Sequence, residues 1–151
     1  MDHSIAMLDE TDQATKKMLQ NVINRKRKFD YLKRKHYWTT IVSLILGFLL
    51  IVYLYYFVVQ PYSYSFFEMF SYFVSKPTSF VYFALVFGMY GYMLVLKKKA
   101  DKAEKEFHAL RCEIVDKSKD LWKQESAWKH RHVIFKVMKD QYDINLFHEN
   151  K

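Results

Sequence analysis

Residues 37–59 read YWTTIVSLILGFLLIVYLYYFVV, a run of 23 residues without a charged side chain. As an α-helix this run is about 34 Å long, slightly more than the roughly 30 Å of a bilayer's hydrocarbon core. A charge at the centre of a membrane helix costs on the order of 3 kcal/mol, so a run of this length without one is informative. The rest of the chain is too small to bury such a helix in a soluble core. The run therefore predicts a first transmembrane helix over 37–59.

A second apolar run, PTSFVYFALVFGMYGYMLVL over 77–96, has 20 uncharged residues, just enough to cross the same core. Pro77 suits the first turn of a helix, where a missing N–H costs no hydrogen bond. Both runs carry aromatic side chains near their ends, which is typical of helices that meet the two membrane interfaces. We therefore expect a second transmembrane helix over 77–96.

Basic residues predict the orientation, because they flank the two runs while the connecting segment holds only Lys76. Lys and Arg are enriched on the cytoplasmic side of membrane proteins. We therefore expect a cell-membrane protein with two spans and both termini in the cytoplasm. Bases beside a bilayer also attract anionic lipids. The lipid-facing bases that we expect are Arg25, Lys26, Arg27, Lys28, Lys97, Lys98 and Lys99.

The chain accordingly divides into five parts, and the expected fold is all-α. The net charge of +8 is shared about equally by the two charged ends. The five parts are a cytoplasmic basic helical arm (1–36), transmembrane helix 1 (37–59), a short outer loop with an interfacial helix (60–76), transmembrane helix 2 (77–96) and a cytoplasmic charged helical tail (97–151).

The outer loop is unusually apolar for an exposed connection. Its apolar residues recur at helical spacing and are Phe66, Phe67, Phe70, Phe73 and Val74. A short helix lying in the outer interface fits this pattern, and an extended strand over 62–65 is the alternative. Ser65 and Glu68 have the spacing of a capping box. We favour that role for Glu68 over a proton or ion site.

The arm and the tail both read as helices that continue the spans, because neither has Gly or Pro beside its span. Each carries an apolar stripe, interrupted in the tail at Lys117 and Gln124. The residues expected to pair as a stalk are Met18, Val22 and Phe29 in the arm and Phe107, Leu110 and Ile114 in the tail. An antiparallel coiled coil within one chain would bury them, and a homodimer is the alternative. Trp122 and Trp128 would then be open to a protein partner.

Small residues recur four apart in each span, a spacing that lets membrane helices approach closely. They are Ser43 and Gly47 in the first span and Ala84 and Gly88 in the second. Counted from the cytoplasmic ends, the two pairs lie at matching depth. We therefore expect helix packing between these faces.

No residue pattern predicts an enzyme, a cofactor or a metal site. His130 and His132 are two apart, so on a helix they point to different faces. Cys112 is the single cysteine and lacks a recognisable catalytic partner. The cluster 25–28 lacks the aromatic interleaving of a nucleic-acid site. We therefore expect a non-enzymatic protein with no cofactor, no metal and no nucleic-acid partner.

The stretches TDQATKKML (11–19) and RKFD (27–30) precede the first apolar run, and a charged helical tail follows the second. In these features the sequence resembles the YpbF-like family of uncharacterised two-span membrane proteins from Bacillus and relatives. The resemblance implies the two-span layout and no activity. Our functional hypothesis is a membrane-anchored scaffold or interaction module that works through its cytoplasmic helices. The alternative is an accessory subunit of a larger membrane transporter or envelope enzyme complex.

Overall fold

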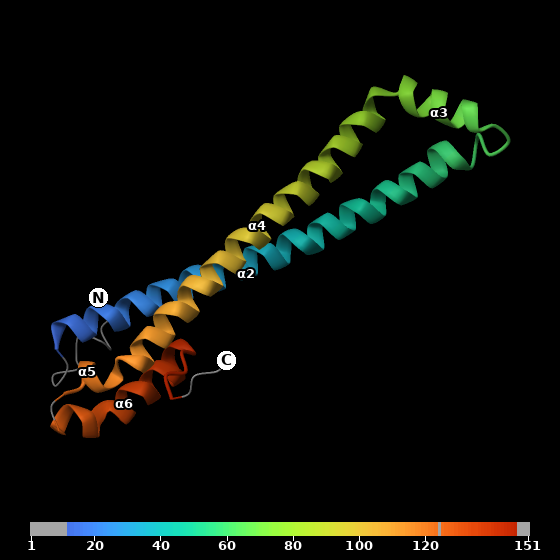
Figure 1. Cartoon of the computed structure of the whole chain (residues 1–151). Helices are drawn as coiled ribbons and strands as arrows, with labels where there is room; N and C mark the ends of the chain where they lie inside the picture. The colour runs from blue at the N-terminus through green and yellow to red at the C-terminus, as the bar shows by residue number, and fades with distance from the viewer. Residues whose placement is uncertain (1–11, 124, 148–151) are drawn as a thin grey trace. The chain divides into compact units, whose positions relative to one another are not determined.

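The computed structural model describes residues 12–123 and 125–147, and within these ranges it contains helices and no strand. The elements are α2 (Gln13–Leu54), the π-helix η1 (Tyr55–Val59), α3 (Phe66–Ser75), α4 (Pro77–Asp116), α5 (Ser118–Leu121) and α6 (Glu125–Tyr142) (Figure 1). The all-α prediction is therefore confirmed for the described residues. The expected helices of arm and first span form one continuous helix, α2, as the absence of a breaker predicts.

The chain divides into two units. One unit, here called the bundle, consists of 12–32 and 100–147 among the described residues, and the other, the apolar unit, consists of 33–99. Helices α2 and α4 each contribute one part to the bundle and one part to the apolar unit. Each unit therefore has its own pairing of α2 with α4.

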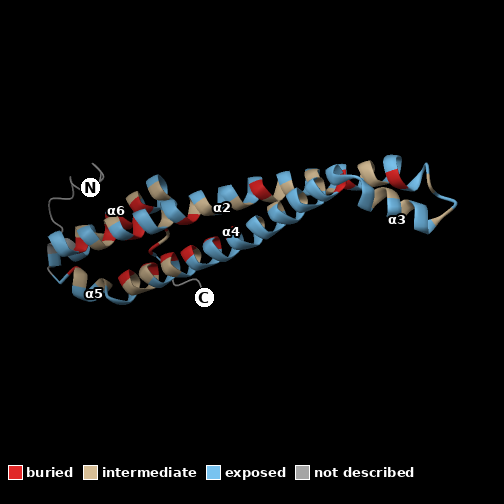
Figure 2. Ribbon diagram, turned by 90° about the horizontal axis from the view of Figure 1, so that it is seen from above, coloured by how far each residue is buried: buried red, intermediate tan, exposed pale blue. Residues whose placement is uncertain are grey.

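Three helices and the segment after α6 build the core of the bundle. Its buried apolar side chains are Leu19, Val22 and Ile23 of α2, Phe107 and Ile114 of α4, Trp122 directly after α5, Ile134, Phe135 and Met138 of α6, and Ile144 and Leu146 after α6 (Figure 2). Fully burying each large apolar side chain contributes roughly 1.5–3 kcal/mol to folding before the entropy cost is counted. The buried Thr15 hydroxyl donates to the Leu121 carbonyl over 3.5 Å, which ties the start of α2 to the end of α5.

The tail differs from the single helix that its apolar stripe predicts. Helix α4 ends at Asp116, Lys117 adopts a turn, and α5 lasts only four residues before the chain turns again at Trp122. The first break falls on Lys117, which is one of the two residues that interrupt the apolar stripe. The other interrupting residue, Gln124, lies outside the described residues. Helix α6 then packs its own apolar face into the bundle core. Trp122 is consequently buried, and the prediction that it is open to a partner is wrong.

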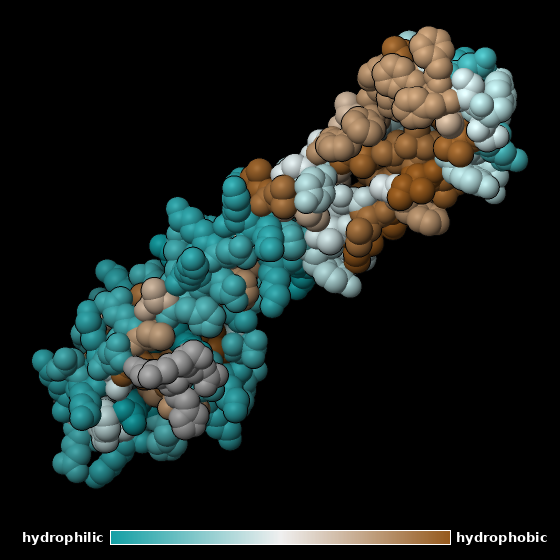
Figure 3. Space-filling view, turned by 45° about the vertical axis from the view of Figure 1, so that its right-hand side comes forward, coloured by the Kyte–Doolittle hydropathy of each residue, from teal (hydrophilic) through white to brown (hydrophobic). Residues whose placement is uncertain are grey.

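The apolar unit joins residues 33–54 of α2 and 77–99 of α4 through η1 and α3. The Tyr53 hydroxyl and the buried Ser79 hydroxyl are 3.2 Å apart, within hydrogen-bond distance. The Tyr53 ring also meets the edge of Tyr82, with centroids 5.9 Å apart. Figure 3 shows apolar side chains covering the visible face of this unit. Its two helices are long and apolar enough to cross a membrane, and only 11% of the residues in either apolar stretch are buried.

Helix α3 confirms the predicted start at Ser65. The Ser65 side chain accepts a hydrogen bond from the Glu68 backbone N–H over 3.4 Å, as an N-cap does. The return half of the capping box is absent, because the Ser65 N–H donates to the Tyr62 carbonyl instead. The Glu68 carboxylate accepts a 2.6 Å hydrogen bond from the Tyr64 hydroxyl, and this bond raises the pKa of Tyr64.

The bundle core predicts a large cost for truncating a buried residue of α6. Met138 is 1% exposed, so Met138→Ala should lower the free energy of unfolding of the bundle by about 2–5 kcal/mol through lost burial and the cavity left behind. Val133, on the same helix, is 46% exposed, and Val133→Ala is the matched control. Thermal unfolding followed by circular dichroism measures both. Equal stability of the two variants would contradict the observed packing of α6.

Candidate functional site

The basic cluster 25–28 contacts other helices of the bundle at its surface. Arg25 forms an ion pair with Glu106 of α4, and the Lys28 ammonium lies 3.9 Å from the same carboxylate. The Arg27 guanidinium lies 5.9 Å from the centre of the Tyr142 ring at the end of α6. Arg25, Arg27 and Lys28 are exposed while making these contacts, so the expected contact of this cluster with lipid stays a prediction.

Lys26 is the most enclosed member of this cluster, with a side chain 13% exposed. Its ammonium lies 3.2 Å from Asp30 and 3.2 Å from Asp143. It also lies 5.8 Å from the Phe29 ring centre and 5.7 Å from that of Phe107. Burial lowers the pKa of Lys26, but hydrogen bonds and charge attraction from Asp143 and Asp30 outweigh it, so the pKa is raised above 10.5.

Asp143 reaches Lys26 from an unusual backbone conformation. Its φ of 55° is left-handed, a conformation that favours glycine at the end of a helix. Its N–H donates to the Lys139 carbonyl, and the next N–H, of Ile144, donates to the Met138 carbonyl. These two nested bonds end α6, each reaching one residue further back than in a Schellman motif, and the buried side chains of Ile144 and Met138 accompany them. An aspartate in this position fixes both the end of α6 and a carboxylate beside Lys26.

A notch of about 360 Å³ opens where α2 meets the end of α6. Its lining is mostly charged and includes Lys26, Arg27, Asp30, Asp140 and Asp143. Bases and acids face one another across it, so the charges are compensated within the chain. The notch therefore serves to hold α6 against α2.

The six predicted stalk residues come together within one chain. Val22, Phe107 and Ile114 are in the bundle core, and Met18 and Leu110 pack against it. The rings of Phe29 and Phe107 stack nearly parallel, with centroids 6.3 Å apart. From the sequence we did not predict that α6 would be a third helix of this core. The spacing of Ile134, Phe135, Met138 and Tyr142 is helical and could have indicated it.

The second basic group, Lys97 to Lys99, is at the end of the apolar unit and differs from the first. All three side chains are exposed, and no acidic partner is found for them among the described residues. On α2 in the same unit, the Lys35 ammonium lies 5.9 Å from the centre of the Tyr92 ring of α4. This contact places the basic ends of the two helices beside each other.

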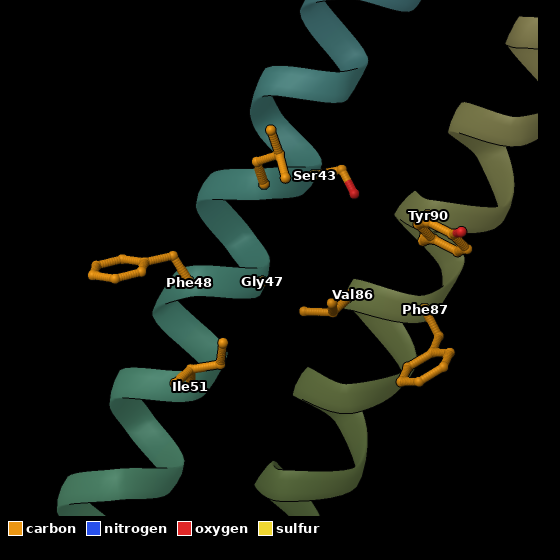
Figure 4. A pocket seen from close by; sticks show the side chains of 8 residues that line it. Ser43, Gly47, Phe48, Ile51, Val86, Phe87 and Tyr90 are labelled. Atoms are coloured by element: carbon orange, nitrogen blue, oxygen red, sulfur yellow. The ribbon is translucent and has the colours of Figure 1, made fainter.

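The small residues of the two apolar stretches do not meet. Ala84 and Gly88 are exposed, while Ser43 and Gly47 face a cavity of about 540 Å³ between α2 and α4 (Figure 4). The residues that line this cavity are Ser43, Leu44, Gly47, Phe48, Ile51, Val86, Phe87 and Tyr90. A Cβ placed on Gly47 or Gly88 would meet no atom within 4 Å. Within this chain the predicted close packing of these glycines is therefore absent.

Contacts of larger residues hold the helix pair together instead. Tyr53 bonds with Ser79 across the two helices, and Leu50 and Val58 are buried in the same unit. A serine hydroxyl inside an apolar run is a candidate for an interhelical hydrogen bond, so Ser79 was the signal in the sequence that could have revealed this contact.

No group of three or more His, Cys, Asp or Glu side chains is arranged to hold a metal ion anywhere in 12–123 and 125–147. His132 is exposed, and Cys112 is a free thiol of intermediate exposure. The described residues offer three surface features as candidate sites. They are the charged notch between α2 and α6, the apolar cavity beside Gly47, and the exposed group Lys97 to Lys99.

Comparisons with known proteins show the family of the chain. Residues 18–149 match the family described as "Protein of unknown function (DUF2663)". The chain is also 36% identical over 143 residues to the uncharacterised protein YpbF of Bacillus subtilis (strain 168), covering 93% of this chain and 92% of that protein. The chain belongs to this family. No solved structure matches it significantly. The matched range includes the whole apolar unit, all of α4 and α6, and all but the first five residues of α2.

The raised pKa of Lys26 predicts a pH-dependent contribution to stability. Because its pKa in the folded chain is above the ordinary 10.5, the ion pairs stabilise the bundle fully below pH 10.5 and lose their effect as the pH rises through the folded value. Lys26→Met should therefore be less stable than wild type at pH 8, by about 1 kcal/mol or less. The difference should shrink in unfolding curves measured well above pH 10.5. A difference that stayed constant would exclude the charge of Lys26 as its source.

The open space at Gly47 makes a prediction opposite to that of close glycine packing. Gly47→Ala should leave the resistance of the helix pair to detergent denaturation unchanged or raise it, because alanine favours a helix by up to about 1 kcal/mol over glycine. Ser79→Ala should lower that resistance, since it removes the partner of Tyr53. If Gly47→Ala proved the more damaging change, the two helices would be closer than the structure shows.

Proposed function

We propose that the chain is an integral membrane protein whose apolar unit crosses the bilayer twice and whose bundle is a cytoplasmic docking module for a protein partner. It has no enzymatic activity of its own in this proposal. The observation that carries it is the exposed apolar surface of the unit formed by 33–99.

Large apolar side chains on both helices of this unit point outward. Leu44 is 69% exposed, Phe48 and Ile51 are 66% exposed, and Val81 is 67% exposed. The core helix of a soluble protein would be mostly buried, whereas a membrane helix turns such side chains to lipid. A removable signal sequence is disfavoured for another reason. The residues before the first stretch include Leu19, Val22 and Ile23, which are fully buried in the bundle core.

The charges of the apolar unit support an orientation. Bases gather at one end of the helix pair, and Glu68 is the single acid in 33–99. Lys76, beside α3, is the single base of the connecting segment. The asymmetry favours a cytoplasmic position for the ends at 33 and 99 and an outer position for α3. Phe66 and Phe67 of α3 are 79% and 78% exposed, which suits a helix whose aromatic face enters the outer interface.

The docking role of the bundle rests on α6. Trp128 is 38% exposed, and the Arg131 guanidinium stacks on its ring at 3.8 Å. Tryptophan and arginine are the residues most often responsible for binding energy in protein interfaces. This pair remains accessible on a helix whose other face is fixed in the core, so it offers a rigid contact for a protein partner.

The apolar cavity beside Gly47 favours a second candidate, an accessory subunit of a larger membrane complex. A foreign helix could approach closely there, since nothing occupies the space around Gly47. Purification in mild detergent separates the two candidates. Gly47→Leu should release a co-purifying membrane protein if the cavity is the interface, whereas Trp128→Ala should release a partner of the bundle.

The proposed topology predicts a pattern of thiol labelling in intact cells. A membrane-impermeant maleimide should miss Cys112 until the cells are permeabilised, because the bundle is in the cytoplasm. A cysteine introduced by Ser71→Cys, in a Cys112→Ser background, should react without permeabilisation, since Ser71 is exposed on α3. Labelling of Cys112 alone in intact cells would invert the topology, and equal labelling of both would argue against insertion.

A further inference from the structure

We propose that the basic end of the apolar unit binds the phosphate groups of anionic lipids, and that the cluster 25–28 does not. The site, here called the basic collar, consists of Arg34 on α2 and Lys97, Lys98 and Lys99 on α4. This inference rests on the proposed membrane insertion and narrows the lipid contact to one of the two basic groups.

The collar has an excess of positive charge. Its four side chains are exposed and form no ion pair among the described residues, and Asp101, four residues after Lys97 on α4, is the one acid close to it on that helix. Three consecutive lysines on a helix are spaced by about 100° each, so Lys97 to Lys99 spread their charges around α4. Such a distribution suits several lipid headgroups around the helix better than one small anion.

The two halves of the collar are at the same end of the unit. Lys35 on α2 contacts the Tyr92 ring on α4. Because the two helices run antiparallel, residues before Lys35 and residues after Tyr92 extend toward the same side. Arg34 is therefore on the side of Lys97, and the collar joins both helices.

Aromatic side chains place the collar at headgroup depth. Tyr37 and Trp38 are 62% and 61% exposed, and their rings meet edge to face with centroids 6.3 Å apart. Amphipathic aromatic rings lie at the boundary between headgroups and hydrocarbon. Arg34 is one helical turn before Trp38, on the headgroup side. A free phosphate ion would make no use of this adjoining apolar surface, so we assign the site to lipid.

The charge of the cluster 25–28 is largely compensated. Arg25 and Lys28 share Glu106, Lys26 has Asp30 and Asp143, and Arg27 lies over the Tyr142 ring. A lipid phosphate would have to compete with these partners. The structure therefore separates two basic groups that look alike in the sequence.

Trp38 provides the reporter for the test. The full-length chain, with Trp122→Phe and Trp128→Phe so that Trp38 is the single tryptophan, is reconstituted into phosphatidylcholine vesicles containing phosphatidylglycerol. Bromination of the acyl chains of one lipid or the other makes that lipid a quencher of Trp38 fluorescence. The ratio of the two quenching curves gives the relative association constant of phosphatidylglycerol beside Trp38. The collar variant is Lys97→Gln/Lys98→Gln/Lys99→Gln, and Arg25→Gln/Arg27→Gln/Lys28→Gln is the control with the same loss of charge.

The unchanged collar should prefer phosphatidylglycerol by roughly fivefold for each base in contact, and high salt should reduce the preference. The collar variant should lose most of this preference while phosphatidylcholine still quenches Trp38, and the control variant should keep it. A ratio near one for the unchanged collar, or a loss confined to the control variant, would overturn the proposal. Absence of quenching by both lipids would contradict membrane insertion itself, and the collar with it.

Discussion

The apolar side chains of this chain are accommodated in two different ways, and the rest of the structure follows from that division. In the bundle they pack against one another from three helices, so that Leu19, Ile114 and Ile144 are fully buried. In the apolar unit most of the apolar side chains point outward, although both of its helices are long and strongly apolar. A helix satisfies its own backbone hydrogen bonds, so it can present apolar side chains on every face only where the surroundings are apolar too. This constraint is the reason we propose lipid as the environment of 33–99.

The bundle joins the first part of α2 to the segment after α6. Residues from α2 and from the segment after α6 are more than 100 positions apart in sequence, yet Lys26 and Asp143 form an ion pair and Ile23 and Ile144 share one core. The charged pairs at the surface add little energy. The apolar core supplies the larger stabilisation. The partners of the cluster 25–28 within the bundle are the reason we propose Arg34 and Lys97 to Lys99, and not this cluster, as the bases that bind lipid.

The long helices could be predicted from the sequence because their signals are local. An uncharged run, a proline at a first turn and the spacing of Ser65 to Glu68 each depend on neighbouring residues. The helices that pack on an apolar stripe cannot be predicted from neighbouring residues in the same way. The stripe of the arm indicates a buried face at Val22, but it does not indicate how many helices cover that face. The return of α6 depends on turns at Lys117 and Trp122, neither of which has Gly or Pro to mark it. The depth match of Gly47 with Gly88 failed for a related reason, because depth does not determine rotation about the helix axis. Contacts such as that of Tyr53 with Ser79 determine the rotation.

The claim on which the account depends is that the exposed apolar side chains of 33–99 face lipid. Spin labels placed singly at Leu44, Phe48 and Ile51, in a Cys112→Ser background in reconstituted bilayers, test it by electron paramagnetic resonance. Oxygen concentrates in the hydrocarbon core, whereas a neutral nickel chelate stays in water. The account predicts high accessibility to oxygen and low accessibility to nickel at all three positions. High accessibility to nickel, or exclusion of both probes as in a packed protein core, would contradict it.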